Sequence, residues 1–134
     1  MYKRDYILKM VQQIYSAIAR LLNDDDRGLT ERQKDVEAMY SMFGGDADYF
    51  RSADVEEILR DLTKFEDDYA ERVEMLAEVM YADARLFIGN YEIRRDIIAK
   101  SLALYNYADE HFGEYSIERI GRMAELQEML KIYQ

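Results

Sequence analysis

Carboxylates are the one abundant reactive group in this sequence of 134 residues, which holds 28 aspartates and glutamates, one histidine, His111, and no cysteine. Without cysteine the chain has no zinc–thiolate site, iron–sulfur ligand, disulfide or thiol nucleophile. One imidazole cannot build a metal centre that needs two or three histidines. Any catalysis would therefore be carboxylate chemistry, and the enzyme class to test is a carboxylate- and metal-dependent hydrolase acting on a small phosphorylated molecule.

The spacing of the carboxylates does not complete a known helical metal site. Di-iron bundles need Glu-x-x-His pairs on one helix face, but Ala108 stands three residues before His111. Helical nucleotide pyrophosphohydrolases hold magnesium with a Glu-x-x-Glu pair and a later Glu-x-x-Asp pair. Glu71 and Glu74 match the first pattern, whereas the second does not occur. The sequence thus predicts no catalytic residue, no cofactor and no metal ligand, with the hydrolase as the alternative.

Four carboxylates share one face of a predicted helix at positions i, i+4, i+7 and i+11: Asp67, Glu71, Glu74 and Glu78. Like charges four residues apart destabilise a helix by roughly a few tenths of a kcal/mol, so this acidic stripe needs water, cations or a basic partner. Two interpretations follow, a solvated outer face or a docking surface for a basic segment. Arg94 and Arg95 lie early in the next predicted helix, and we expect them to pair with these acids; the alternative is that they bind an acidic ligand.

The elements that position these groups are all predicted to be helices. The chain has no proline and is 49% apolar, and long stretches rich in Ala, Leu, Glu, Arg and Met favour helix over strand. We expect a single all-α domain over residues 1–134, with five or six helices in antiparallel pairs. Residues 1–23 form a long N-terminal helix, residues 30–65 form shorter helices, and residues 66–134 form a helical-hairpin part.

Capping residues mark the expected helix boundaries. The segment from residue 46 to residue 54 is expected to be a loop, and the helix that ends near Ile88 either begins at residues 63–66 or continues the short helix before it. In the last helix Ile117, Ile120, Met123, Leu126 and Leu130 form the apolar stripe. The expected helix starts are Thr30, Asp54, Thr63, Asn90 and Ser116, and glycines expected just past helix ends are Gly44, Gly89 and Gly113.

The charge is strongly negative and unevenly distributed. Eighteen basic and 28 acidic residues give a net charge of −10. Residues 1–22 carry four basic residues and one acidic residue, whereas residues 23–83 carry seven basic and 19 acidic residues. Phosphate backbones repel such a domain, so we expect no nucleic-acid partner. No apolar window reaches the ~18 residues of a membrane span, and no signal peptide is evident, so we expect no membrane partner and a cytoplasmic location.

The N-terminal helix is the predicted partner surface. Its apolar residues recur at steps of four and three and are widened by further apolar positions, which favours burial against the bundle or against a dimer mate. Tyr105 and Tyr107 are two residues apart and cannot share a helix face, so at least one should face solvent, a cavity or another subunit. The candidate interaction surface is Ile7, Val11, Ile14, Ile18, Leu21, Tyr105 and Tyr107.

Two resemblances add to this prediction. The opening Met1-Tyr2-x-x-Asp5-Tyr6-Ile7-x-x-Met10-Val11-x-x-Ile14, followed by Ala19-Arg20-Leu21-Leu22, resembles the start of a family of short bacterial all-helical proteins, a domain of unknown function whose later part is tetratricopeptide-like. The Gly-x-Tyr segments at residues 89–91 and 113–115 are similar to the tetratricopeptide turn. Arg94 and Glu118 depart from that repeat, which has a small residue there. The resemblance implies antiparallel helix pairs over about residues 70–131.

Together these observations predict a non-enzymatic helical domain, tetratricopeptide-like or an irregular bundle, that works by protein–protein interaction. The partner is not identified by the sequence, and homodimerisation is one form the interaction can take. An apolar groove with outward carboxylates would favour this function. A pocket lined by Glu71, Glu74 or His111 with inward carboxylates would favour the hydrolase.

Overall fold

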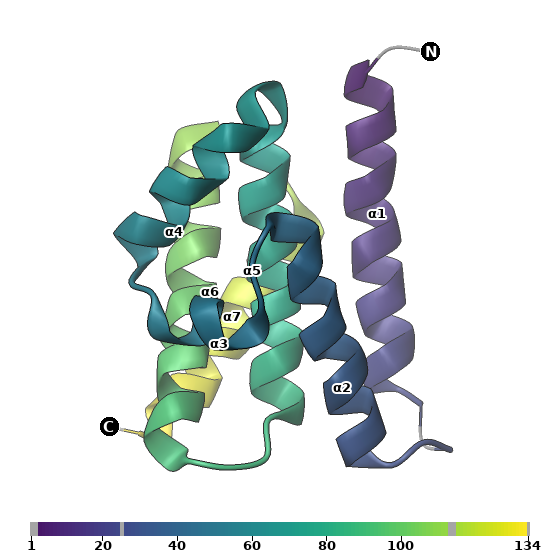
Figure 1. Cartoon of the computed structure of the whole chain (residues 1–134), viewed down its shortest axis with the longest axis vertical. Coiled ribbons are helices and arrows are strands. Elements are labelled where there is room, and N and C mark those ends of the chain that lie inside the picture. The colour runs from purple at the N-terminus through teal and green to yellow at the C-terminus, as the bar shows by residue number, and fades with distance from the viewer. Residues whose placement is uncertain (1–2, 25, 113–114, 134) are drawn as a thin grey trace.

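The computed structural model describes residues 3–24, 26–112 and 115–133. These residues form α-helices and two short 3₁₀ helices, and no strand occurs among them, which confirms the predicted all-α fold (Figure 1). No helix in the described ranges is long and apolar enough to cross a membrane. The elements are α1 Lys3–Leu22, α2 Leu29–Met39, η1 Tyr40–Phe43, α3 Ala47–Ser52, α4 Val55–Leu62, η2 Thr63–Asp68, α5 Tyr69–Leu86, α6 Tyr91–Phe112 and α7 Ile117–Lys131.

Helix α5 is the centre of the molecule. Residues 75–84 are all buried, because α1, α2, α6 and α7 pack around this helix. Alanines at positions 77, 82 and 84 let the neighbouring helices approach closely. Figure 1 shows α6 running alongside α5 on one side and α1 on the other. A helix with this much buried surface must also bury its polar side chains, and these create the candidate site described below.

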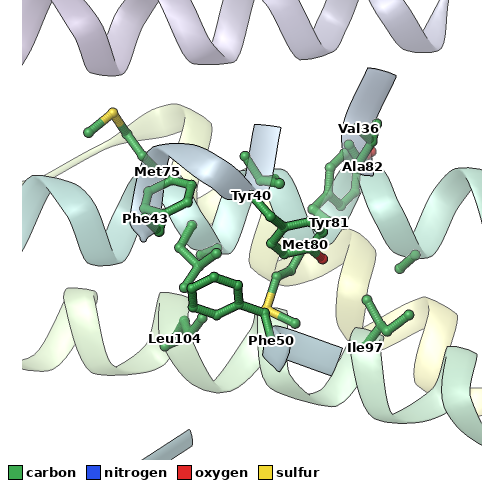
Figure 2. Packing of buried hydrophobic residues seen from close by; sticks show 14 of the residues in the cluster. Val36, Tyr40, Phe43, Phe50, Met75, Met80, Tyr81, Ala82, Ile97 and Leu104 are labelled. Atoms are coloured by element: carbon green, nitrogen blue, oxygen red, sulfur yellow. The ribbon is translucent and has the colours of Figure 1, made fainter. Parts of the chain in front are cut away.

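An aromatic cluster from η1 and α3 packs against α5 and α6. Tyr40 and Phe50 stack with ring centroids 5.5 Å apart and planes 16° apart, and Phe43 meets Phe50 edge to face. Figure 2 shows these rings in the core beside Met80 and Leu104. This apolar core is continuous from α1 to α7.

The expected loop over residues 46–54 was wrong, because it contains α3. The Asp46 carboxylate accepts a hydrogen bond from the Tyr49 amide at 2.8 Å and caps the helix. Six residues are too few for a helix to be stable by itself. Burial of Ala47 and Phe50 against the rest of the core supplies the missing stabilisation.

Three of the predicted caps are confirmed. Asp54 accepts from the Glu57 amide at 2.8 Å, Asn90 accepts from the amides of residues 92 and 93, and Ser116 accepts from the Arg119 amide at 3.1 Å. The predicted cap at Thr30 was wrong, because α2 begins at Leu29 and its N-cap residue is Gly28, which has no side chain to cap it.

The short helix α4 and the central helix α5 are separate. The 3₁₀ helix η2 lies between them, and Glu66 inside it has φ 51° and ψ −111°, which breaks the helical path. Thr63 therefore does not cap α5, and its hydroxyl donates to the Arg60 carbonyl. Gly44 follows η1 directly with a left-handed φ of 83°, as predicted. Gly89 has φ 148° but is not directly past the helix end, because α5 ends at Leu86 and Phe87 is its C-cap. Gly113 lies outside the described residues.

Candidate functional site

A groove runs between α1 and α7, with α5 as its floor. It consists of three adjoining cavities of about 530, 390 and 360 Å³ that share lining residues. We call it the α1–α7 groove. Its walls are Leu8, Val11, Gln12, Tyr15, Ser16 and Ala19 on one side and Tyr115–Arg119, Gly121, Arg122 and Glu125 on the other; Ala70, Glu71 and Glu74 form the floor, and His111 and Phe112 close one end.

Glu74 joins both walls of the groove at its floor. One carboxylate oxygen accepts a hydrogen bond from the Tyr15 hydroxyl of α1 at 2.7 Å. The other accepts from the Arg119 guanidinium of α7 at 3.3 Å. Arg119 also donates to Asp109 of α6 at 3.1 Å, and its side chain is only 5% exposed. Four helices are therefore connected through this one ion-paired cluster.

Glu78 lies one turn further along α5 and has no exposed surface. Arg122 binds its carboxylate through Nε at 2.9 Å and Nη2 at 3.0 Å, and the Tyr105 hydroxyl donates to Oε1 at 2.6 Å. Burial raises the pKa of Glu78 more than Arg122 lowers it. Burial, followed by the Glu78 charge, raises the pKa of Tyr105 well above 10, so its hydroxyl stays protonated and donates.

Glu78 makes stability depend on pH in the direction opposite to that of an ordinary ion-paired carboxylate. Because its folded pKa is above the ordinary value of 4.5, folding is coupled to proton uptake when the pH falls through the folded pKa. We expect the native protein to gain stability relative to the Glu78→Gln variant as the pH falls from neutrality to about that ordinary value. Urea unfolding of both proteins at stepped pH measures this difference, and a difference that changes in the other direction contradicts the prediction.

The acidic stripe is not a solvated outer face. Of its four members Asp67 is exposed, whereas Glu71 and Glu78 are buried and Glu74 is mostly buried. The reason is that other helices cover most of α5, so Glu74 and Glu78 pair with Arg119 and Arg122 of α7. The expected pairing with Arg94 and Arg95 was also wrong. Arg94 donates to the Ala84 carbonyl and the Tyr133 hydroxyl, and Arg95 pairs with Asp96.

The outer edge of the groove is apolar and carries exposed carboxylates. Leu8 is 40% exposed, Tyr115 79% and Ile117 71%. The expectation that Ile117 and Ile120 face the core was therefore wrong, since α7 turns its Arg119 and Arg122 side inward. Glu118 is exposed and Glu125 is 44% exposed. Exposed apolar side chains around a hollow are typical of interaction sites.

Gly121 lies in the wall of the groove, and no close contact within the chain requires a glycine at this position. A methyl group built on this residue would meet no atom within 4 Å. Glycine inside a helix costs roughly 0.5–1 kcal/mol relative to alanine, so the fold itself would be more stable with alanine here. Ser16 and Ala19 of α1 line the same cavity, and this part of the groove is therefore walled by small residues on both sides.

The predicted interaction surface is mostly core. Ile7, Ile14, Ile18, Leu21 and Tyr105 are all buried within the chain, so they are not available to a partner. The inward face of α1 packs on α5, which is the predicted alternative of burial against the bundle. Tyr107 is half-buried, accepts a hydrogen bond from Tyr69 at 3.2 Å and stacks on His111. Val11 is the one member of the predicted set that lines the groove.

Sequence reasoning missed Tyr15, Arg119, Arg122 and Gly121 as site residues. A usable signal was present for the arginines: they lie three residues apart on α7, and Glu74 and Glu78 lie four apart on α5, so each pair occupies one face of its helix. Nothing in the sequence indicates that these two faces meet, because about 44 residues separate Glu78 from Arg122.

The groove end beside His111 has the features that would favour an enzyme. Glu71, Glu74, His111 and Arg119 line this cavity together with apolar side chains. His111 is exposed, and its Nδ1 lies 3.0 Å from the Tyr107 carbonyl. No three His, Asp or Glu side chains gather as a metal-binding group in the described part of the chain. The guanidinium group of Arg119 occupies the position on Glu74 that a cation would take.

A second buried ion pair lies outside the groove and fixes α3 to α5. Asp83, which has no exposed surface, accepts from Arg51 through Nε at 2.9 Å and Nη2 at 2.7 Å, and from the Tyr40 hydroxyl at 2.6 Å. Arg51 also pairs with Glu37 at 3.0 Å. All four partners are used within the chain, so this cluster is structural.

Comparison with models of known families, with curated proteins and with solved structures finds no match to this chain. The resemblance of its first helix to a bacterial family therefore stays a prediction, and the candidate site depends on its geometry alone.

Proposed function

We propose that this protein is a non-enzymatic interaction domain that binds a segment of a partner protein in the α1–α7 groove. The observation that supports this proposal is the groove itself, which has exposed apolar side chains at its edge and a floor held by internal ion pairs. Apolar rims supply the buried area that binding needs, and ion-paired floors keep their shape without a ligand. The partner is a protein because the hollow is long, open and lined by side chains of several kinds.

The cavity end at Glu71, Glu74 and His111 favours a second candidate, the carboxylate-dependent hydrolase acting on a small phosphorylated molecule. We place it second because both oxygens of Glu74 already accept hydrogen bonds from Tyr15 and Arg119. Release of phosphate from a nucleoside triphosphate in the presence of Mg²⁺, lost in Glu74→Gln, would support this candidate.

Photo-crosslinking tests the interaction proposal. A benzophenone amino acid replaces Ser16 inside the groove, and a matched control replaces Gln127, an exposed residue on α7 that does not line it. After irradiation in a lysate of the source organism, we expect one dominant adduct from position 16 and none from position 127. The Ile117→Glu variant, which places a charge on the apolar rim, should abolish it.

The mass of that adduct identifies the type of partner. An adduct of twice the 15.9 kDa chain mass would make a second copy of this chain the partner. Equal crosslinking at both positions, or an adduct that persists in Ile117→Glu, contradicts the proposed function.

A further inference from the structure

We propose that the occupant of the α1–α7 groove is a positively charged amphipathic helix, with its backbone passing closest to Gly121. This inference rests on the proposed function and adds the chemistry of the partner. Three features of the groove carry it: the sign of its accessible charges, the nature of its walls, and the small residues at one point along it.

The charges that a partner can reach are carboxylates. Glu118 and Glu125 both line the cavity around Gly121. Glu118 is exposed, whereas Glu125 is 44% exposed and ion-paired with Arg85 at 3.5 Å and Arg122 at 3.3 Å. The arginines in the same wall are less accessible. Arg119 is 5% exposed and paired with Glu74 and Asp109, and Arg122 is 19% exposed and paired with Glu78 and Glu125. Because these arginines are already paired and the Glu118 carboxylate is exposed, lysine or arginine in the partner is the complementary charge.

The walls of the groove favour a helix over an extended chain. The walls are mostly helical, formed by α1 and by α7 with the two residues before it, so most of their backbone amides and carbonyls are hydrogen-bonded within the helices. An extended segment would find few backbone partners here, whereas a helix satisfies its own backbone groups and presents only side chains. Leu8 and Ala19 line opposite ends of the α1 wall. At 1.5 Å per residue they are about 16 Å apart, which is roughly three helical turns.

The small residues mark where the backbone of the partner helix comes closest to the backbone of α7. Gly121 leaves open space where a side chain would stand, and Ser16 and Ala19 line the same cavity from α1. A glycine in mid-helix that the fold does not need is explained if a partner backbone occupies this space. The partner then carries a small residue at the crossing, with larger aliphatic residues one turn away, near the exposed side chain of Ile117.

Three synthetic peptides test this inference on the full chain. The first is an amphipathic peptide of about 18 residues, long enough for the roughly three turns of the groove, with a leucine face interrupted by one alanine and a lysine face. The second has glutamate in place of every lysine, and the third has two central prolines that prevent helix formation. Binding is followed by the amide NMR signals of Ser16, Ala19 and Gly121 and by fluorescence anisotropy at two salt concentrations.

We expect the lysine peptide to shift these signals and to bind at least about tenfold more tightly than the other two, with affinity that falls as salt rises. Gly121→Leu should weaken binding about tenfold or more. The matched control Ala124→Leu, an exposed position on the same helix outside the groove lining, should change it less than about twofold. Gly121→Ala should raise the Tm by a few degrees, since its methyl group meets nothing in the free protein.

The outcomes separate the two proposals. If the glutamate or proline peptide shifts the groove signals as strongly as the lysine peptide, the basic-helix inference is wrong and the groove remains a binding site. If Gly121→Leu binds the lysine peptide normally, the close approach at Gly121 is wrong. If no peptide shifts these signals, the inference fails, and the crosslinking result at position 16 then decides whether the proposed function fails too.

Discussion

Replacing Asp83 by alanine is expected to lower the free energy of unfolding by about 3–5 kcal/mol, because the change leaves a charged partner buried without its counter-ion. Arg51 is only 12% exposed and loses two hydrogen bonds, and the Tyr40 hydroxyl loses its acceptor. Such a loss is a large part of the ~5–15 kcal/mol that stabilises a domain. Urea denaturation followed by circular dichroism measures it.

Two control variants make the Asp83 prediction specific. Asp96→Ala removes a carboxylate that is 52% exposed and paired with an exposed arginine, so its cost should stay below about 0.5 kcal/mol. Replacing the whole cluster with apolar residues, as Asp83→Leu, Arg51→Met and Tyr40→Phe, should recover most of the lost stability. If Asp83→Ala costs no more than Asp96→Ala, the ion pair does not fix α3 to α5.

Replacing Phe50 by alanine is expected to cost about 3–5 kcal/mol, the usual range for removing a buried aromatic ring. Phe50 is 1% exposed and contacts three other aromatic rings, those of Tyr40, Phe43 and Tyr49. Its burial is also what stabilises the six residues of α3. We therefore expect amide hydrogen exchange in α3 to rise more than exchange in α6, because the short helix loses its main anchor.

The Phe50→Leu variant is the matched control for this second prediction. Leucine keeps an apolar side chain in the site and should cost less than about half as much as alanine. If alanine and leucine destabilise equally, ring packing around Tyr40 and Phe43 is not what holds α3 in place, and the cap made by the Asp46 carboxylate would then be the main determinant.

The helices themselves were predictable because their signals are local. Apolar residues at steps of three and four along α1 place Ile7, Ile14 and Ile18 on one face, and that face is buried. The side chains of Asp54 and Ser116 cap the helices that follow them, as their positions predicted. Each of these signals depends on residues within about one turn of each other, so the sequence alone carries the information.

The sequence-based predictions failed where the conformation or orientation of a segment depends on residues that are distant in the sequence. Residues 46–54 follow two glycines and carry three aspartates, a pattern that favours a loop, and only burial of Phe50 in the aromatic core makes part of this segment a helix. The orientation of α7 was missed for a related reason. Its isoleucines fit an inward stripe, but the buried glutamates of α5 require counter-ions, so Arg119 and Arg122 take the inward face and Ile117 is left exposed.

The sequence by itself determined the helical class, most helix boundaries, and which chemistry the chain lacks, since these follow from composition and from spacing within single helices. Only the tertiary structure decided that the acidic stripe faces inward, that Glu78 binds Arg122, and that α1 and α7 enclose a groove. The physical reason is that helix periodicity defines faces but not their neighbours. Which faces meet is set by the combined packing of apolar surface and buried charge over the whole chain.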